Sequence, residues 1–482
     1  MKILFIFKSH DFMVPRGPSI ISAIACGKGH ETYLCEMNSE DPLERVARLE
    51  PEVVAYSSMS GESKHYLRLN RAIKERFPDI FTIMGGPHPT FFPEVIDSST
   101  LDAICIGEGD GAIGDVLDRL SAGQPVDGLP NIATRRGRSP IRNAVADLDS
   151  LPFPDYDLFY ENIPIMGNAP LKSIMASRGC PYNCTYCFNA RWKEIYKGHG
   201  EIVRRHSVDY VMEDIARVRS KWPLSCVKFY DDVFVYRVDD WLEEFCRKYR
   251  QQVGLPFFIL TRYDLLTEDM VKLLKEAGCR TISMSIEAGN PEIRNKLLKR
   301  KMTDEQIIEA SLLCEKYGIY TFTNAILALP GSTLKDDIRS IDLAIEAKST
   351  WAEFACFYPY PGTELGDQTI QMGLYSPDYN HMHTSYQNYS LLSGFTETER
   401  RVQRNLGVLG PVAVVIPGLR NLILNHLVYW PYNKFFVFMY WAVKTWVIRR
   451  KIYYTRTNLW QSLRIYIRSF KQEFFRHTEE EK

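Results

Sequence analysis

Short apolar runs alternate with amphipathic stretches along the first part of the chain. KILFIF (2–7), VVAYSSM (53–59), FTIMGG (81–86) and AICIGEG (103–109) are separated by segments in which apolar residues have helical spacing. Strands that alternate with helices form βαβ units, so this pattern predicts an N-terminal doubly wound α/β domain with a parallel sheet. The loops after these strands are small or glycine-rich, and ligands bind such sheets beyond the carboxyl ends of the strands.

A second strand–helix alternation begins at residue 172. Its six apolar runs are KSIMAS, CVKFYDD, FFILTR, RTISMSIEAG, YTFTNAILALPG and AEFACFYPY. Amphipathic helices are predicted between them, at 208–221, 238–252, 267–277, 303–317 and 334–347, with helix start signals such as Thr267 and Thr303. Six parallel strands are too few to close an eight-stranded barrel. We therefore expect an open, partial (β/α)6 barrel with functional groups at the carboxyl ends of its strands.

Composition divides the chain further. A segment rich in Pro and Asp, ADLDSLPFPDYDLF, lies within residues 146–171 and predicts a linker between a domain at 1–145 and the barrel at 172–370. The remaining residues, 371–482, lose the alternation and are expected to form a mainly α-helical region rich in aromatic and basic residues.

The C-terminal region has two candidate roles. Residues 434–476 contain ten Lys or Arg and one acidic residue, and the longest apolar run, 435–443, has nine residues. A membrane-spanning helix needs about twenty apolar residues, so a span is not expected. Aromatic, basic and amphipathic segments suit either a helical cap over the barrel mouth or a membrane surface. The absence of a recognised nucleic-acid module disfavours an RNA-binding tail.

Charge and cysteine content narrow the class of protein. The chain has 482 residues, 45% of them apolar, and Lys plus Arg equal Asp plus Glu at 59 each. A folded protein of two or three domains is indicated, and net charge gives no sign of a nucleic-acid partner. The first apolar run is too short for a signal peptide. A cytoplasmic location is therefore predicted, where the eleven cysteines would stay reduced.

Three of these cysteines stand together directly after the first predicted barrel strand. Cys180, Cys184 and Cys187 have the spacing C-x3-C-x2-C. Three thiolates hold three irons of a 4Fe–4S cube and leave the fourth iron open to another ligand. Structural zinc is the alternative, but it requires a fourth ligand, and His199 and His206 are at unsuitable spacing for a compact site.

The segment SRGCPYNCTYCFN (177–189) resembles the signature of radical S-adenosylmethionine (radical SAM) enzymes. Further segments resemble the family in the same order: FYDDVF (229–234), SIEAGNPEIRNKLLKR (285–300), LALPGSTLKDDI (327–338) and FYPYPGTEL (357–365). The resemblance implies that the open iron chelates SAM, whose reductive cleavage gives a radical that removes hydrogen from an unactivated carbon. The implied SAM contacts are Tyr186, Phe188, Asp231, Asp232, Arg262, Ser285, Glu287, Leu329 and Pro330.

These implied contacts have different expected partners. Asp231 and Asp232 could accept hydrogen bonds from the ammonium of SAM or contact an axial ligand of a second cofactor. Arg262 could pair with the carboxylate of SAM, because a guanidinium matches a carboxylate with two hydrogen bonds. Ser285 and Glu287 suit the ribose and the amine. Tyr186 and the backbone around Leu329 and Pro330 are expected near the adenine.

The N-terminal region carries a second resemblance. MGGPHPTFFPEV (84–95) and ICIGEGDGAIGDVL (104–117) resemble the cobalamin-binding domain of one radical SAM subfamily, and LDSLPFPDYDLF (148–159) resembles its linker. Together the resemblances cover roughly residues 1–370. The implied cobalamin contacts are Ser57, Ser58, Met59, Gly85, Gly86, His88, Pro89, Thr90, Gly107, Glu108 and Gly109. A sheet that binds no cofactor is the alternative.

One departure from cobalamin proteins with a histidine ligand concerns the loop after the first strand. They carry Asp-x-His-x-x-Gly there, whereas this loop reads KSHDFMVPRGP, in which His10 precedes Asp11 and no glycine follows at the matching step. Base-off cobalamin without a histidine ligand is therefore expected. His88 is expected to pack beside the corrin instead of ligating cobalt.

The resemblance implies a C-methyltransferase acting on an unactivated carbon of a hydrophobic small molecule or lipid. It also implies an electron donor of the ferredoxin or flavodoxin type. Two alternatives stay open: an oxidative cyclase or rearrangement enzyme that uses the same cofactors without net methylation, and a non-catalytic cobalamin or redox sensor. The aromatic and basic tail is the reason to consider a lipid substrate and peripheral contact with the inner face of the membrane.

Overall fold

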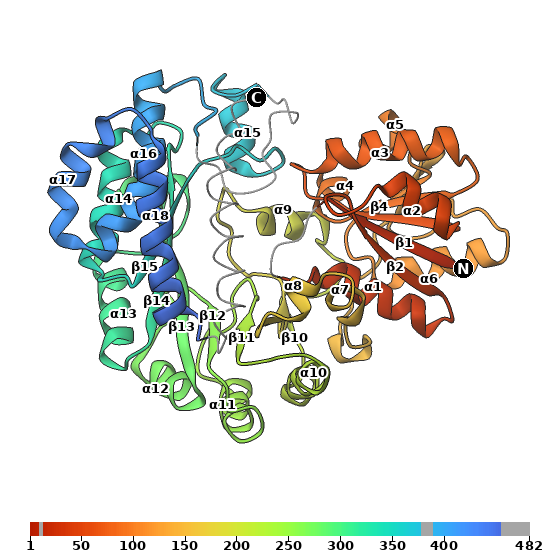
Figure 1. The fold of residues 1–482 in the computed structure, drawn as a ribbon, viewed down its shortest axis with the longest axis horizontal. Coiled ribbons are helices and arrows are strands. Elements are labelled where there is room, and N and C mark those ends of the chain that lie inside the picture. The colour runs from red at the N-terminus through yellow and green to blue at the C-terminus, as the bar shows by residue number, and fades with distance from the viewer. Residues whose placement is uncertain (9–12, 377–388, 455–482) are drawn as a thin grey trace.

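The computed structural model describes residues 1–8, 13–376 and 389–454. Two α/β units, each built on a parallel sheet, lie side by side, and the helices of the C-terminal region pack against the second unit (Figure 1). This arrangement confirms the predicted fold class. The domain boundaries at residues 145, 171 and 370 stay predictions.

The N-terminal sheet contains β1 (Lys2–Phe7), β2 (Glu31–Glu36), β3 (Val53–Ser57), β4 (Phe81–Gly85), β5 (Ala103–Cys105), β6 (Ile132–Thr134) and β7 (Gly137–Arg138). Their order is β2-β1-β3-β4-β5-β6-β7, and the first five strands pair in parallel. The antiparallel strands β6 and β7 extend one edge and were not predicted, because their residues, IAT and GR, form no apolar run. The strand order reverses between β1 and β3, the place where open α/β sheets bind ligands.

Helices cover both faces of this sheet. They are α1 (Arg16–Gly27), α2 (Pro42–Leu49), α3 (Ser63–Arg76), α4 (Pro87–Phe91), α5 (Val95–Ser98) and α6 (Asp110–Ser121). Along β1, Ile3 and Phe5 belong to one apolar core and Leu4 and Ile6 to another, one on each face. Burial on both faces explains why this strand is apolar at every step instead of at alternate positions.

The second sheet contains β8 (Leu171–Ile174), β11 (Cys226–Phe229), β12 (Phe257–Leu260), β13 (Cys279–Glu287), β14 (Tyr320–Leu327) and β15 (Trp351–Cys356). All six strands are parallel, in the order β15-β14-β13-β12-β11-β8, which confirms the open partial barrel. The intervening helices are α10 (Val208–Lys221), α11 (Asp240–Gln252), α12 (Glu268–Ala277), α13 (Asp304–Lys316) and α14 (Leu334–Glu346). Their ends match the predicted helices within about two residues.

Short elements connect the two units and carry the loop of the three cysteines. They are α7 (Asp157–Tyr160), α8 (Pro164–Gly167), the two-stranded hairpin of β9 (Ser177–Arg178) and β10 (Arg204–Arg205), and α9 (Phe188–Ile195). In Figure 1, α9 lies between the barrel and the N-terminal sheet.

The C-terminal helices are α15 (Glu364–Gln371), α16 (Glu397–Val415), α17 (Arg420–Asn425) and α18 (Lys434–Val447). Helix α16 packs on β15 and α14, and α18 packs on α16 (Figure 1). Beyond α18, Arg280 and Thr281 at the start of β13 donate hydrogen bonds to backbone oxygens of Arg450, Lys451 and Ile452.

For residues 434–454, the described part of the predicted tail, this placement disagrees with a cap over the barrel mouth. The described C-terminal helices lie along the edge strand, and the chain after them reaches the amino ends of the strands, opposite the cysteine loop. The reason is that β15 would otherwise be an exposed apolar edge. Residues 455–482 of the predicted tail lie outside the described residues. Within the described part, no helix combines the length and apolar character needed to cross a lipid bilayer.

Candidate functional site

A cavity of about 340 Å³ lies where the carboxyl ends of the N-terminal strands face the β9–β10 hairpin. Phe5 of β1 and Ser57 of β3 both line it, so it stands at the point where the strand order reverses. Six of the predicted cobalamin contacts line this cavity: Ser57, Gly85, Gly86, Gly107, Glu108 and Gly109. From the barrel side, Arg178, Gly179, Asn189, Trp192, Arg204 and Asp232 line it.

Two glycines in the cavity wall could not be replaced without a collision. Gly86 has φ +92°, and a Cβ there would lie 2.9 Å from the backbone nitrogen of Ser58. Gly107 has φ +85°, and a Cβ there would overlap the hydroxyl of Tyr196. At both positions neighbouring protein occupies the place of a side chain, so glycine is required for the loops of this wall to pack closely. The cavity that these loops line lies beyond the carboxyl ends of the strands, where a corrin would fit.

The other predicted cobalamin contacts lie behind this wall. Thr90 Oγ1 donates to the Gly86 carbonyl at 2.9 Å and accepts from Gly107 N at 3.0 Å, so Thr90 fastens two loops together. Ser58 and Pro89 are buried, and Met59 is exposed. None of these four residues is among those that line the cavity.

His88 also lies behind the wall, buried at 6% exposure. Its Nδ1 lies 3.2 Å from Ser60 Oγ, and burial lowers the pKa of His88 to about 4. The loop residues His10 and Asp11 lie outside the described residues, so the expected absence of a histidine ligand stays a prediction.

Two arginines join the cavity wall of the N-terminal sheet to the β9–β10 hairpin, whose two strands flank the cysteine loop and α9 in sequence. Arg178 donates to both oxygens of Asp110, at 2.7 and 3.0 Å. Arg204 donates to both oxygens of Glu108, at 2.5 and 3.1 Å. All four side chains are buried or nearly so, with exposures of 18% or less. Such charge-assisted, two-bonded pairs fix orientation as well as distance.

The predicted cluster ligands Cys180, Cys184 and Cys187 lie on the loop from β9 to α9. Burial raises the pKa of the Cys180 thiol and raises that of Cys187 to about 12, and the nearby cysteines add to both shifts. Among the described residues, no group of three or more Cys, His, Asp or Glu side chains is arranged to hold a metal ion. The donor set itself, three thiols on one tight loop, fits a 4Fe–4S cluster.

Arg300 approaches this loop and was missed as a site residue by the sequence reasoning. Its Nη1 lies 3.6 Å from Cys184 Sγ, and its Nη2 donates to the Ser285 carbonyl at 2.9 Å. Ser285 and Arg300 are the two ends of the segment 285–300 that resembles the radical SAM family. The position of Arg300 at the end of that segment is the sequence signal that could have identified it as a site residue.

Tyr186 and Glu287, both predicted SAM contacts, are brought together. The Tyr186 hydroxyl donates a 2.6 Å hydrogen bond to Glu287 Oε1. Glu287 has φ +63° and follows a register irregularity that begins at Ser285 in β13. Left-handed backbone at a non-glycine residue is costly and persists where the surroundings enforce it, often at functional sites.

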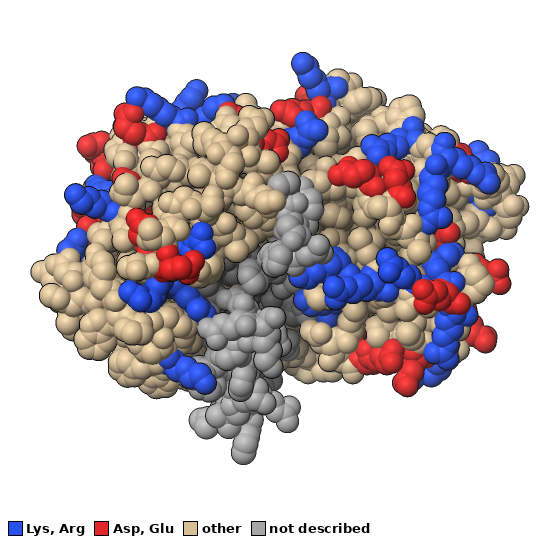
Figure 2. Space-filling view, turned by 90° about the horizontal axis from the view of Figure 1, so that it is seen from above, with Lys and Arg blue, Asp and Glu red and all other residues tan. Residues whose placement is uncertain are grey.

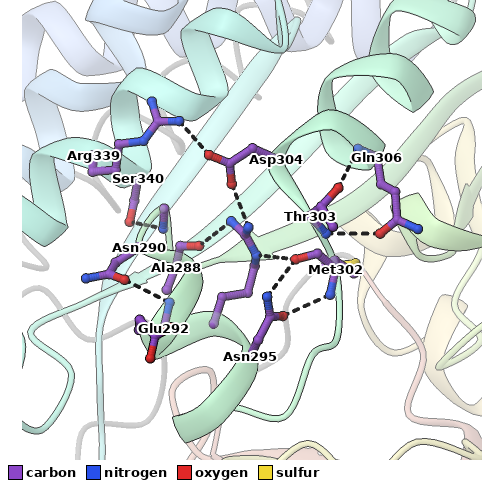
Figure 3. Close-up of polar contacts among 12 residues, drawn as sticks. Ala288, Asn290, Glu292, Asn295, Met302, Thr303, Asp304, Gln306, Arg339 and Ser340 are labelled. Carbon is purple, nitrogen blue, oxygen red and sulfur yellow. Dashed lines mark hydrogen bonds and ion pairs between the residues drawn. The ribbon is translucent and has the colours of Figure 1, made fainter.

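A buried network braces the chain directly after Glu287 (Figure 3). Arg294 has no exposed side-chain surface and donates to the carbonyls of Ala288 and Met302, at 3.1 and 2.9 Å. It also pairs with Asp304 at 2.5 Å, and the second oxygen of Asp304 accepts from Arg339 at 2.7 Å. Helix α13 therefore holds the end of β13 in place.

Asp231 and Asp232, adjacent at the end of β11, have different surroundings. Asp231 is fully buried, and its Oδ1 accepts from Ala176 N at 3.0 Å and Ser177 Oγ at 2.5 Å. Burial raises the pKa of Asp231 to about 6. Asp232 lines the cavity, so its surface is accessible while nearby protein limits its hydration, and this raises its pKa. Asp232 is thus the better placed of the two to meet a ligand.

Arg262 is already engaged by protein groups. It pairs with Asp264 at 2.9 and 3.0 Å, donates to the Arg300 carbonyl at 2.7 Å, and lies 3.8 Å from the ring centre of Tyr182. Its Nη1 is buried and has no hydrogen-bond partner in the described structure. That atom is the part of Arg262 left to meet a carboxylate.

The remaining predicted SAM contacts lie at the two sides of the barrel mouth. Phe188 stacks on Phe91 of the N-terminal unit, with ring centres 4.5 Å apart, and lies 5.2 Å from Tyr360. Leu329 and Pro330 are buried after β14. All assignments of individual residues to SAM, cobalamin and the cluster stay predictions.

Two family models match the chain. The radical SAM superfamily model matches residues 174–344, and the B12 binding domain model matches residues 4–117. The first range contains the three cysteines and Glu287, and the second contains the strands and loops that form the N-terminal wall of the cavity.

Three curated relatives span most of the chain. An uncharacterized methyltransferase of Pyrococcus horikoshii is 25% identical over 350 residues, 70% of this chain and 74% of that protein. The cytidylyl-2-hydroxyethylphosphonate methyltransferase of Streptomyces wedmorensis is 25% identical over 406 residues, 74% of each protein. The hopanoid C-3 methylase of Methylococcus capsulatus is 25% identical over 323 residues, 65% of this chain and 60% of that protein.

Solved structures share the fold. The cobalamin-dependent radical enzyme OxsB superposes with a TM-score of 0.66 at 15% identity, covering 100% of this chain and 76% of that one. The radical SAM methyltransferase TsrM of Kitasatospora setae superposes with a TM-score of 0.62 at 17% identity, covering 77% and 76%. With both family models matched in order on one chain, the protein belongs to the cobalamin-dependent radical SAM enzymes, which use a 4Fe–4S cluster, SAM and cobalamin.

Proposed function

We propose that this enzyme is a C-methyltransferase that acts on an unactivated carbon of a hydrophobic small molecule or lipid. The observation that carries the proposal is the shared cavity. Predicted cobalamin contacts such as Gly107 and Glu108 form one wall, and Gly179 and Asp232, next to the predicted cluster and SAM contacts, form the other. Methyltransferase names among the relatives support the reaction class.

When bound, cobalamin supplies a transferable methyl group, and the cluster with SAM supplies a radical that removes a hydrogen atom. In this proposal Cys180, Cys184 and Cys187 hold the cluster. Tyr186 and Glu287 orient SAM through their shared 2.6 Å hydrogen bond, and Arg300 sets the position of the Cys184 sulfur.

Aromatic side chains on α9, and one on the N-terminal unit that faces it, would keep water away from a reactive radical. Phe91 stacks on Phe188, and Trp192 stacks on Tyr196 with ring centres 5.0 Å apart. The contact between Phe91 and Phe188 joins the N-terminal unit to α9. The proposal includes a ferredoxin- or flavodoxin-type electron donor and a cytoplasmic location, with the hydrophobic substrate taken from the inner face of a membrane.

Anaerobic reconstitution with iron, sulfide and hydroxocobalamin, followed by incubation with SAM and a reductant, tests the proposal. Methyl transfer predicts a methylated product, S-adenosylhomocysteine and 5′-deoxyadenosine. Oxidative cyclisation without methylation predicts 5′-deoxyadenosine and no S-adenosylhomocysteine. The matched control is Cys184→Ser, which is expected to give none of these products.

Two outcomes would contradict the proposal. One is protein purified without oxygen that contains thiolate-bound zinc and no iron. The other is a cluster-loaded, reduced sample that binds cobalamin but does not cleave SAM, which would favour a sensor. Candidate substrates are best screened as lipid extracts and polar metabolites in parallel, because one relative is named for a polar nucleotide substrate.

A further inference from the structure

Exposed hydrophobic side chains concentrate in one part of the C-terminal region. Among the described residues, the large hydrophobic side chains exposed outside residues 416–454 are Met59, Tyr230, Leu312 and Met372. Within residues 416–454 the exposed set includes Leu422, Tyr429, Trp430, Phe435, Phe438 and Trp446, with exposures from 45% to 64%. We call these six residues the aromatic face.

Helix α18 is apolar on two sides, and only one of them is used by the core. Phe436, Tyr440 and Val447 are buried. Phe435, Phe438 and Trp446 follow the spacing i, i+3 and i+11, so they form a second stripe along the same helix. A helix needs one apolar side to pack on its own domain. The second, exposed stripe of α18 therefore indicates contact with another apolar partner outside this domain.

The chain segments that carry the aromatic face are basic, and the two acids that reach them from the barrel, Asp342 and Glu353, are paired with Arg420 and Lys444. No Asp or Glu occurs between Glu399 and Glu473, whereas thirteen Lys or Arg do. Lys434 stands at the start of α18, Arg450 continues the stripe one turn beyond Trp446, and the Lys451 ammonium lies 5.6 Å from the Trp446 ring. In Figure 2 the lower left of the molecule is a broad uncharged surface, whereas charged residues of both signs lie along the upper left.

The face is rigidly joined to the barrel. The Tyr440 hydroxyl donates to Glu353 Oε2 of β15 at 2.7 Å, and Lys444 pairs with Glu353 at 3.2 Å. Asn405 of α16 donates to the carbonyls of Val428 and Trp430, both at 2.8 Å. Any surface that binds the aromatic face therefore binds the whole catalytic barrel in one orientation.

We infer that the aromatic face docks on an anionic lipid bilayer as a peripheral membrane surface. Aromatic rings sit at the level of the lipid headgroups, and adjacent bases meet anionic lipid. A second copy of this chain fits less well, because a two-fold interface would set two copies of the same basic segments, including Lys434, Arg450 and Lys451, against each other. Membrane docking itself does not depend on the proposed function. Only the purpose given to it, access to a lipid substrate, rests on that function.

Sedimentation with vesicles tests the inference on the full chain. The vesicles are phosphatidylcholine with phosphatidylglycerol at about 3:1, and phosphatidylcholine alone. The triple variant F435Q/F438Q/W446Q is expected to bind anionic vesicles at least tenfold more weakly, because the buried apolar area is lost. Its matched control, L312Q/M372Q, removes exposed apolar side chains elsewhere and is expected to bind like the wild type.

A second pair of variants isolates charge. R450Q/K451Q is expected to reduce partitioning on anionic vesicles about 30-fold and to leave binding to phosphatidylcholine unchanged. The control R247Q/R250Q removes two exposed charges from α11 and is expected to have no effect. Circular dichroism melting checks that each variant is folded.

Several outcomes overturn the inference. One is a wild type that does not sediment with anionic vesicles, and another is a triple variant that sediments like the wild type. A dimeric wild type with a monomeric triple variant, and no vesicle binding, would assign the face to self-association.

Vesicle binding by the wild type without any methylated product would count against the proposed function alone. A triple variant that no longer binds vesicles but cleaves SAM like the wild type would show that the aromatic face acts in membrane binding and not in the reaction.

Discussion

Arg178 donates two hydrogen bonds, of 2.7 and 3.0 Å, to the carboxylate of Asp110 across the boundary between the two α/β units. Arg178 lies two residues before Cys180, and Asp110 begins the helix that follows the glycine-rich loop at Gly107. The pair therefore sets the position of the cysteine loop relative to the predicted corrin wall.

Arg178→Ala is expected to lower the free energy of unfolding by about 3–5 kcal/mol, because it leaves Asp110 buried and unpaired. Urea denaturation measures the loss. The double variant R178A/D110A is expected to recover part of it, since neither partner then remains alone. A loss in the double variant equal to the sum of the losses in R178A and D110A would mean that the pair is not coupled. The control R191A changes an exposed arginine of α9 and is expected to cost less than about 1 kcal/mol.

The network in Figure 3 predicts unequal effects for two arginines that share Asp304. Arg294→Met is expected to destabilise by about 3–5 kcal/mol, because two carbonyls and a carboxylate lose their buried donor. Arg339→Met removes a partly exposed partner and is expected to cost about 1 kcal/mol or less. Thermal or urea denaturation compares them. A larger loss for Arg339→Met would contradict the structure.

The pH dependence of stability should have a component from Asp337. Burial raises its pKa to about 7, while Ala328 N and Gln403 Nε2 donate to its two oxygens. A raised pKa means that its contribution to stability is fully present below the unfolded pKa, about 4, and is lost as the pH rises through 7. Asp337→Asn is therefore expected to be more stable than the wild type at pH 8, by roughly 2–4 kcal/mol, and not at pH 4.

The Asn side chain can be accommodated, because Gln403 Oε1 has no partner in the described structure and could accept a hydrogen bond from it. Urea denaturation at several pH values provides the measurement. The neighbouring Asp336→Asn is the control with the opposite sign, since the hydrogen bonds of Asp336 to Asn290 and Thr333 outweigh its desolvation and lower its pKa. A gain in stability from Asp337→Asn that does not change with pH would rule out titration of Asp337 as its cause.

Replacing any of the three predicted cluster ligands should remove the iron. Cys180→Ser, Cys184→Ser and Cys187→Ser are each expected to fall from about four irons per chain to less than one after anaerobic reconstitution. Iron analysis and visible absorbance measure the change. Cys26→Ser, at an exposed cysteine on α1, is the matched control and should keep its iron. Iron retained by all three variants would place the cluster elsewhere.

Much of the fold could be predicted from the sequence, because its elements repeat. Helices such as α10 and α14 were located by a 3.6-residue pattern and a capping residue, and both patterns are local. Strands β6 and β7 were missed because their residues, IAT and GR, form no apolar run of the kind that marked β5. The region 371–482 was predicted to be mainly helical, but composition gives neither the bounds of its helices nor the strand that they cover.

The candidate site was predicted unevenly for a similar reason. Cys180, Cys184 and Cys187 are close in sequence, so their spacing alone indicates a shared ligand. Asp231 and Asp232 look alike in sequence, but one is buried against Ser177 and the other lines the cavity. Arg300 reaches Cys184 only because the barrel brings together residues more than a hundred positions apart.

By itself, the sequence determined the two α/β units, the order of their strands along the chain and the three-thiol loop, because helical and strand periodicity and short-range spacing are properties of neighbouring residues. Only the tertiary structure decided that Arg178 and Arg204 fasten that loop to Glu108 and Asp110, and that one side of α18 stays exposed. Those contacts depend on how distant segments pack, and packing is settled by burial and charge pairing across the whole molecule.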